Sequence, residues 1–302
     1  MCTIYRNVIL LTRFSRHITT STAAAMSTDI GASLRLVRQR IAGAHEKFLL
    51  DHPKSSTTLP RLVAVSKTKP AELLQEAYDN GQRCFGENYV QELVQKANHF
   101  HEKGITDIEW HFIGLLQRNK VNNVLSAPNL SMVETVESIK LADALNKSWA
   151  KKNLDRKLKV MVQVNTSDEE SKSGCHPTEC VNVVDHVRTK CPALQFCGLM
   201  TIGSFDHNYE EGPNPDFLLL VKCRQDVCEA FGLSVDDVEL SMGMSGDFEH
   251  AIQAGSSNIR VGSTIFGART PKVANSGQST SAQTPPSSGP VNPPDVSDLK
   301  IS

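Results

Sequence analysis

The sequence has no excess of charge of either sign, no apolar run long enough to cross a bilayer and no paired-cysteine motif. Its 32 lysines and arginines balance 33 aspartates and glutamates, which argues against nucleic acid as the main partner. Without a long apolar run, we predict no membrane span. Eight cysteines are present, but none forms a C-x-x-C pair and their other spacings match no zinc template. We therefore predict free thiols and no metal site.

Both ends of the chain differ in composition from the middle. The first 26 residues contain arginine, serine and threonine, and no acidic residue precedes Asp29. This composition is typical of a mitochondrial transit peptide, and a cytosolic extension is the alternative, so cytoplasm and mitochondrion both stay open. The chain from about residue 274 is rich in Ser, Pro, Gln, Thr and Gly, which predicts a disordered tail. We expect an extension over 1–27, a folded domain over 28–272 and a tail over 273–302.

Between these ends, short apolar segments alternate with amphipathic ones. After a helix over 30–50, the pattern predicts eight strands: 61–67, 84–86, 108–113, 132–136, 158–164, 194–202, 238–242 and 258–266. Alternation of strands and helices implies parallel pairing through right-handed crossovers. The sequence therefore predicts an α/β fold, a single (β/α)8 barrel of the TIM type. A doubly wound open sheet is the alternative, weakened because no G-x-G-x-x-G follows the first strand.

Lys67 stands at the end of the first predicted strand, directly after an apolar, β-branched run. In α/β barrels this end of the strands carries the active site. An amine that leaves an apolar wall is expected to have a lowered pKa, and the neutral amine can attack an aldehyde to form a Schiff base. A strand-end lysine that simply reaches water is the alternative.

Six further predicted strand ends carry polar or sulfur-containing residues: Asn88, His111, Asn165, Met200, Ser241 and Arg260. In a barrel these residues would converge on one ligand site. His111 could titrate near neutrality or act as a structural donor. Met200 could pack on one face of a ring. Asn88 and Asn165 could bond ring substituents or hold their own loops.

The last two predicted units are rich in glycine and hydroxyl residues. Ser245 could cap a short helix that begins at Gly246, whose free N–H groups would face an anion. Gly262 permits close backbone approach, and Ser263 and Thr264 add hydroxyl donors. Barrels frequently bind phosphate at this place. Phosphate together with an aldehyde-reactive lysine points to pyridoxal 5′-phosphate (PLP), and an ordinary capped helix with a small-residue turn is the alternative.

Arg260 would project from the eighth strand toward the ring of this cofactor. Arginine stays protonated, so beside the pyridine nitrogen it would keep that nitrogen unprotonated. Such a ring is a weaker electron sink, which disfavours transaminase and decarboxylase chemistry. A structural pairing of Arg260 with Glu87 is the alternative.

Seven segments, in order, resemble one family: LVAVSKTKP (62–70), FGENYVQE (85–92), WHFIG (110–114), VQVNTSDEESKSG (162–174), GLMTIG (198–203), LSMGMSGDFEHAI (240–252) and IRVGSTIFGAR (259–269). Over about residues 29–269 the chain is similar to the pyridoxal phosphate homeostasis proteins, also called PLP-binding proteins or proline synthetase co-transcribed homologs.

The resemblance implies a fold-type III PLP barrel like the N-terminal domain of alanine racemase, with PLP as a Schiff base on Lys67 and Arg260 at the ring nitrogen. The implied phosphate contacts are Ser245, Gly246, Gly262 and Ser263 or Thr264. The implied role is PLP homeostasis: carrying PLP, supplying it to PLP-dependent apo-enzymes and controlling its free concentration. The resemblance implies no robust catalysis, so we assign no catalytic residue.

An amino-acid racemase of the alanine racemase type is the alternative function. Such an enzyme typically recruits a tyrosine from a second, β-rich domain, and the segment after the predicted barrel is too short and too low in complexity to form one. Tyr89 is the tyrosine nearest the predicted barrel mouth. Leu115 replaces a histidine that the family often has, which removes a polar group from that mouth. We expect an open site suited to PLP exchange, and a monomer.

Overall fold

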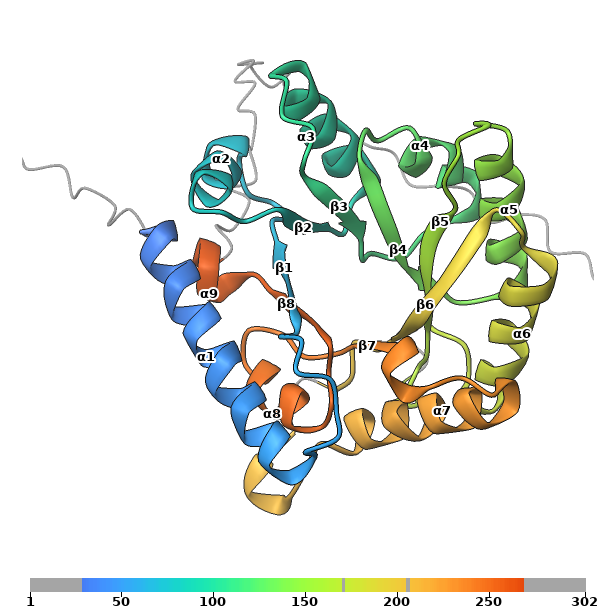
Figure 1. The fold of residues 1–302 in the computed structure, drawn as a ribbon. Coiled ribbons are helices and arrows are strands. Elements are labelled where there is room, and N and C mark those ends of the chain that lie inside the picture. Colours follow the sequence, from blue (N-terminus) through green and yellow to red (C-terminus); the bar gives the residue numbers. More distant parts are fainter. Residues whose placement is uncertain (1–28, 170–171, 205–206, 269–302) are drawn as a thin grey trace, which may run out of the picture. The chain divides into compact units, whose positions relative to one another are not determined.

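The structure, a computed structural model, describes residues 29–169, 172–204 and 207–268, which form a closed barrel of parallel strands surrounded by helices (Figure 1). The strands are β1 (Arg61–Val65), β2 (Cys84–Glu87), β3 (Glu109–Phe112), β4 (Leu130–Val136), β5 (Leu158–Gln163), β6 (Leu194–Met200), β7 (Glu239–Ser241) and β8 (Asn258–Val261). Their order in the sheet is their order in the sequence, and β8 pairs with β1. The predicted barrel is confirmed, and the open-sheet alternative is wrong.

Helices cover the outside of this ring of strands (Figure 1). They are α1 (Ile30–Asp51), α2 (Ala71–Asp79), α3 (Val90–Glu102), α4 (Val121–Leu125), α5 (Ile139–Ala150), α6 (Cys180–Lys190), α7 (Pro215–Phe231), α8 (Phe248–Gln253) and α9 (Ser263–Phe266). Several begin at side chains that satisfy the first free N–H groups: Asp29 accepts from Ala32 N at 2.8 Å, and Ser138 caps α5 as predicted.

Two predicted elements near the end of the domain have different limits. The segment predicted as a strand to residue 266 is extended only to Val261, and Ser263–Phe266 is the short helix α9. The N–H groups of Ile265 and Phe266 donate to Gly262 O, so an apolar pair that resembles strand sequence closes a helical turn instead. The short helix predicted to begin at Gly246 begins at Phe248.

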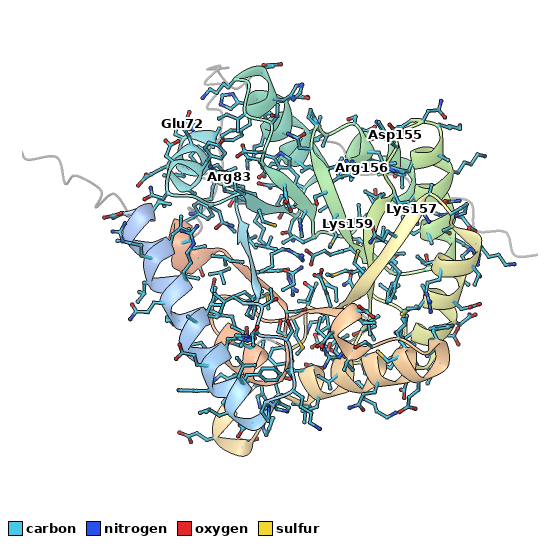
Figure 2. All side chains as sticks on the ribbon, in the orientation of Figure 1. Glu72, Arg83, Asp155, Arg156, Lys157 and Lys159 are labelled. Atoms are coloured by element: carbon cyan, nitrogen blue, oxygen red, sulfur yellow. The ribbon has the colours of Figure 1, made fainter. Side chains whose placement is uncertain are left out.

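The main apolar core lies between the strands and the helices and includes Phe85, Trp110 and Phe217, each at most 1% exposed. Burial of a large apolar side chain contributes about 1.5–3 kcal/mol each. A separate cluster of Met132, Met161 and Met200 forms on β4, β5 and β6. Figure 2 shows side chains filling the centre of the ring, so the barrel is packed rather than hollow.

Charged residues lie near the starts of the strands, on the face opposite the strand ends, and one pair of them joins two strands. Arg61 in β1 forms a bidentate pair with Glu239 in β7, at 2.5 and 3.1 Å. Arg83 and Arg156, both labelled in Figure 2, precede β2 and β5. The guanidinium of Arg156 lies over the ring of Trp149, 4.8 Å from its centroid. In a barrel this face serves stability rather than chemistry.

Gly198 in β6 faces the backbone of β7 closely enough to exclude any side chain. A Cβ added there would lie 2.1 Å from Glu239 O. We expect Gly198→Ala to lower the free energy of unfolding by about 1–3 kcal/mol, measured by urea denaturation. Gly43 in α1 is the matched control, because nothing lies within 4 Å of its added Cβ. Gly43→Ala should raise stability by about 0.5–1 kcal/mol, and equal effects of the two changes would contradict the packing argument.

The predicted extension over 1–27 and tail over 273–302 lie outside the described residues, so these limits stay predictions. Within the part of the chain that the structure describes, no helix combines the length and the hydrophobicity needed to cross a membrane.

Candidate functional site

A cavity of about 630 Å³ opens where the strands end. Its lining comes from the last residues of β1, β6 and β8 and from the segments that follow β1, β2, β3, β6, β7 and β8, which are far apart in the sequence. Its volume falls in the range of pockets that bind small molecules, about 300–1,000 Å³. The barrel therefore forms a cavity at the end of the strands where barrels carry their active sites.

Eight of the ten predicted site residues line this cavity: Lys67, Asn88, Met200, Ser245, Gly246, Arg260, Gly262 and Ser263. Asn165 and Thr264 do not line it. Asn165 holds its own loop, because its amide nitrogen donates to Glu169 O at 3.0 Å and to Lys172 O at 3.2 Å. Thr264 belongs to α9, whose neighbouring residues Ser263 and Gly267 line the cavity although Thr264 does not.

Lys67 lies in a tight turn that follows β1. The N–H of Lys69 donates to Ser66 O at 3.0 Å, and Thr68 has a left-handed backbone with φ of 64°. Lys69 also lines the cavity, and its Nζ donates to Ala268 O at 2.8 Å. Burial lowers the pKa of Lys69 from its usual value. Two primary amines therefore share the cavity.

Arg260 is almost fully buried in β8, with 4% of its surface exposed. Its Nη1 donates to Ser241 Oγ at 2.6 Å and its Nη2 to Thr201 O at 2.7 Å. Ser241 Oγ in turn donates to Glu134 Oε2 at 2.6 Å. Glu87, the alternative partner considered from the sequence, contacts a lysine of α3 instead. The arginine is therefore oriented by the barrel interior and not by Glu87.

Glu134 and His111 form a fully buried ion pair inside the barrel, with His111 Nδ1 2.5 Å from Glu134 Oε1. Asn258 also donates to Glu134, at 3.1 Å. Burial alone would lower the pKa of His111, but Cys84 and Glu134 outweigh it and raise this pKa to about 10. Burial would raise the pKa of Glu134, but His111 and Arg260 outweigh it and lower this pKa to about 2. Of the two roles considered for His111 from the sequence, the contact with Glu134 favours that of a structural donor.

This pair makes stability depend on pH in a defined window. The pKa of His111 is raised on folding, so its stabilising contribution is complete below pH 6.5 and is lost as the pH rises through about 10. The pKa of Glu134 is lowered, so its contribution is complete above pH 4.5 and is lost as the pH falls through about 2. We expect the free energy of unfolding, measured by urea denaturation, to decline from pH 6.5 to 10. His111→Gln should lose this decline, and a flat profile in the unchanged protein would contradict the pairing.

The turns after β7 and β8 are joined by a side chain with a different role from the one predicted. Ser245 Oγ accepts from Gly262 N at 3.1 Å and therefore links the two turns instead of capping α8. A Cβ added at Gly246 would meet nothing within 4 Å, whereas one at Gly262 would lie 3.2 Å from Val65 O. The wall at Gly246 thus leaves space that a side chain would fill.

The residues that line the cavity fit a phosphate-bearing aldehyde. Lys67, Lys69 and Arg260 supply basic groups, whereas Asp247 is the single acidic residue among the described residues that line the cavity. Asp247 is engaged with the backbone, because its Oδ1 accepts from Met244 N at 2.5 Å. A cavity with surplus positive charge and hydroxyl donors suits an anion, and a primary amine in it suits an aldehyde.

Sequence reasoning missed two aromatic residues that line the cavity, His207 and Tyr209. The ring of Tyr209 stacks on His250 of α8, with centroids 3.8 Å apart. Burial raises the pKa of the Tyr209 hydroxyl. Tyr89, favoured from the sequence because it follows a predicted strand end, is 52% exposed and does not line the cavity. No local pattern marks Tyr209, because it lies on a 3₁₀ turn well beyond the end of β6.

One group of potential metal ligands lies away from the cavity and was not predicted. The ligand atoms of Asp143, His186 and Cys191 all lie within 4.8 Å of one another. His186 Nε2 is 2.7 Å from Asp143 Oδ1, and both residues are accessible to solvent. The hydrogen-bonded pair between α5 and α6 is sufficient to explain this grouping. Burial raises the pKa of the Cys191 thiol to about 11, which favours its protonated form.

Comparison with known sequences links the chain to characterised relatives. A family model described as the N-terminal domain of alanine racemase matches residues 54–270. The pyridoxal phosphate homeostasis protein of Homo sapiens is 53% identical over 250 residues, covering 82% of this chain and 90% of the relative. The protein of that name from Escherichia coli K12 is 40% identical over 247 residues, covering 80% of this chain and 97% of the relative. These relatives are named for homeostasis and not for a reaction.

Comparison with solved structures gives the same fold. PipY of Synechococcus elongatus PCC7942, in a structure with PLP bound, matches with a TM-score of 0.63 and 27% identity, covering 79% of this chain and all of PipY. Alanine racemase from Corynebacterium glutamicum matches with a TM-score of 0.55 and 16% identity, covering 82% of this chain and 62% of the racemase. At that identity the likeness to the racemase shows the fold alone.

Proposed function

The chain belongs to the family of pyridoxal phosphate homeostasis proteins, and from this membership and the cavity we propose that it binds PLP as a Schiff base on Lys67. In this proposal the protein carries PLP, supplies it to PLP-dependent apo-enzymes and controls its free concentration. The relatives are named as homeostasis proteins and not as enzymes, which agrees with the expected lack of turnover.

The observation that carries the proposal is the meeting of a primary amine, a fixed guanidinium and a small-residue turn in one cavity. Lys67 follows β1, whereas Arg260 and Gly262 belong to β8 and the turn after it. Because β8 pairs with β1, these segments are neighbours in the barrel. A PLP-sized anion with an aldehyde would find complementary groups in this cavity.

Each group has a separate part in the proposed binding. When bound, PLP supplies an aldehyde that reacts with primary amines and a ring that can withdraw electrons. Lys67 supplies the amine. Arg260 is held at Ser241 and Thr201, so its position against the ring nitrogen would be set before binding. We assign the phosphate to Ser245, Gly246, Gly262 and Ser263.

The attachment site is tested by chemical trapping. PLP added to the full-length protein is reduced with borohydride, which converts the C=N bond to a stable C–N bond, and the labelled peptide is mapped by mass spectrometry. We expect the label on Lys67. Lys69 is the internal control, since it is a second amine in the same cavity. A label on Lys69 or elsewhere would overturn the assignment.

A racemase is the second candidate function, and Tyr209 in the cavity lining is the observation that favours it. A phenol and an amine in one cavity could in principle exchange an amino-acid Cα proton on two faces. The test is Cα–H exchange in D₂O, followed by NMR with PLP-loaded protein and a panel of L- and D-amino acids. Exchange no faster than with free PLP supports the carrier. Stereoselective exchange that is lost in both Lys67→Ala and Tyr209→Phe would make the protein an enzyme.

Location and assembly remain separate proposals. We propose a monomer, because the sheet of the described residues closes into a barrel and leaves no edge strand for pairing with another copy. Cytoplasm and mitochondrion both stay possible locations, and the segment that would decide between them lies outside the described residues.

A further inference from the structure

Three charged side chains from β2 and α3 form a connected group next to the turn that carries Lys67. Lys96 Nζ lies 2.7 Å from Glu87 Oε1 and 3.0 Å from Glu92 Oε2. Glu87 is fully buried, and the Lys96 side chain is only 9% exposed. A lysine is rarely buried unless it is paired, and here the two carboxylates are its partners.

The group holds the residue before Lys67 through two hydrogen bonds. Lys96 Nζ donates to Ser66 O at 2.8 Å. Ser66 Oγ donates to Glu87 Oε1 at 2.6 Å. Ser66 is itself fully buried, so neither bond competes with water. Ser66, the residue before Lys67, is therefore fixed at both its carbonyl and its side chain.

The group also holds the residue after Lys67. Thr68 N donates to Glu92 Oε2 at 2.7 Å, the oxygen that also accepts from Lys96. Thr68 has φ of 64°, a conformation that a β-branched residue adopts rarely because of steric strain. Such a conformation persists only when its surroundings enforce it, and the charge-assisted bond to Glu92 is part of that enforcement.

Burying these charged side chains costs free energy, which a role in stability alone does not explain. Glu87 Oε2 is buried without a hydrogen-bond partner among the described residues. Burial raises the pKa of this carboxyl above its usual value, against the opposing effect of Lys96. Apolar residues of similar volume often replace a buried ion pair without loss of stability. None of the three side chains lines the cavity, so none is there to contact the ligand.

We infer that Lys96 is a positioning residue for Lys67. With Glu87 and Glu92 it fixes the backbone on both sides of Lys67, so that the amine enters the cavity in one direction. The inference rests on the proposed function, because it concerns how fast that amine captures the aldehyde of PLP. It predicts that Lys96 affects the covalent step more than it affects reversible binding.

The test separates these two steps with two ligands on the full-length protein. The rate of Schiff-base formation with PLP is followed by its visible absorbance in a stopped-flow instrument. The affinity for pyridoxine 5′-phosphate, which has an alcohol in place of the aldehyde, measures reversible binding alone. We expect Lys96→Met to slow Schiff-base formation on the order of tenfold to a hundredfold. Its affinity for pyridoxine 5′-phosphate should stay within about twofold of the unchanged protein's value.

Further variants guard against a general loss of structure. Glu92→Ala keeps the buried pair of Lys96 and Glu87 and removes the bonds of Glu92 to Thr68 N and to Lys96 Nζ, so it should fold and slow the covalent step several-fold. Lys96→Arg keeps the charge but not the shape, and its rate should fall between those of the unchanged protein and Lys96→Met. Lys222→Met is the matched control, because Lys222 forms an exposed pair with Asp226 four residues away on α7. It should change neither readout.

Two outcomes in the variants would overturn the inference. One is a normal rate of Schiff-base formation in folded Lys96→Met. The other is an equal loss of both readouts in Lys96→Met and Glu92→Ala, which would indicate a general structural role. If the unchanged protein neither captures PLP nor binds pyridoxine 5′-phosphate, the proposed function itself fails and the inference falls with it.

Discussion

Lys67→Ala should abolish the borohydride-trapped adduct and weaken the apparent affinity for PLP on the order of a hundredfold, about 2.8 kcal/mol. Alanine removes the amine that we propose forms the covalent bond. The noncovalent contacts of Arg260 and the turns at Ser245 and Gly262 do not depend on that amine. Isothermal titration with PLP and mass spectrometry after reduction measure the two effects.

The control for this prediction uses the other amine of the cavity. Lys69 Nζ is engaged with Ala268 O, so Lys69→Ala should leave the trapped adduct in place. Pyridoxine 5′-phosphate should bind Lys67→Ala and the unchanged protein with similar affinity, because it has no aldehyde. An adduct of undiminished yield in Lys67→Ala would show that another residue is the attachment site.

Glu134→Gln should lower the free energy of unfolding by about 3–5 kcal/mol, because it removes one member of a buried ion pair. Glu134 lies at the centre of the barrel interior and accepts from His111, Ser241 and Asn258. Without its charge, the buried His111 and Arg260 lose their counter-ion. Urea denaturation at pH 6 measures the effect, since the pair contributes fully at that pH.

An exposed pair supplies the comparison. Asp226 is partly exposed and pairs with Lys222 on the surface of α7, where an ion pair contributes about 0–1 kcal/mol. Asp226→Asn should therefore change stability far less than Glu134→Gln. The binding of pyridoxine 5′-phosphate should also weaken in Glu134→Gln, because Ser241 links Glu134 to Arg260. Equal stability losses in the two variants would refute the central role of Glu134.

The fold could be predicted because each strand carries its own local signal. Buried parallel strands read as short apolar runs, and crossover helices separate them at regular intervals. Lys67, Asn88 and Arg260 could be found because they follow or end such runs. The predicted end of the last strand was wrong because the apolar residues Ile265 and Phe266 belong to a helical turn. Their N–H groups donate to Gly262 O.

The partners of the site residues could not be predicted, because they come from distant strands. Glu134 was present as an acidic residue in an apolar strand, yet its partners lie on β3, β7 and β8. Periodicity tells which face of a strand is buried but not which residue of another strand will meet it. The link between Ser245 and Gly262 joins two turns in the same way, and the sequence suggested a helix cap instead.

The order of the strands determines when, during synthesis of the chain, the cavity can form. Lys67 leaves the ribosome early, whereas Arg260 belongs to the last strand and pairs in register with Val63 of the first. A nascent chain can therefore carry the reactive lysine long before a cavity exists around it. If PLP binds only the closed barrel, it draws the equilibrium toward chains whose last strand has docked. Bound PLP would then distinguish fully folded chains from incompletely folded ones, before any transfer of PLP to another protein.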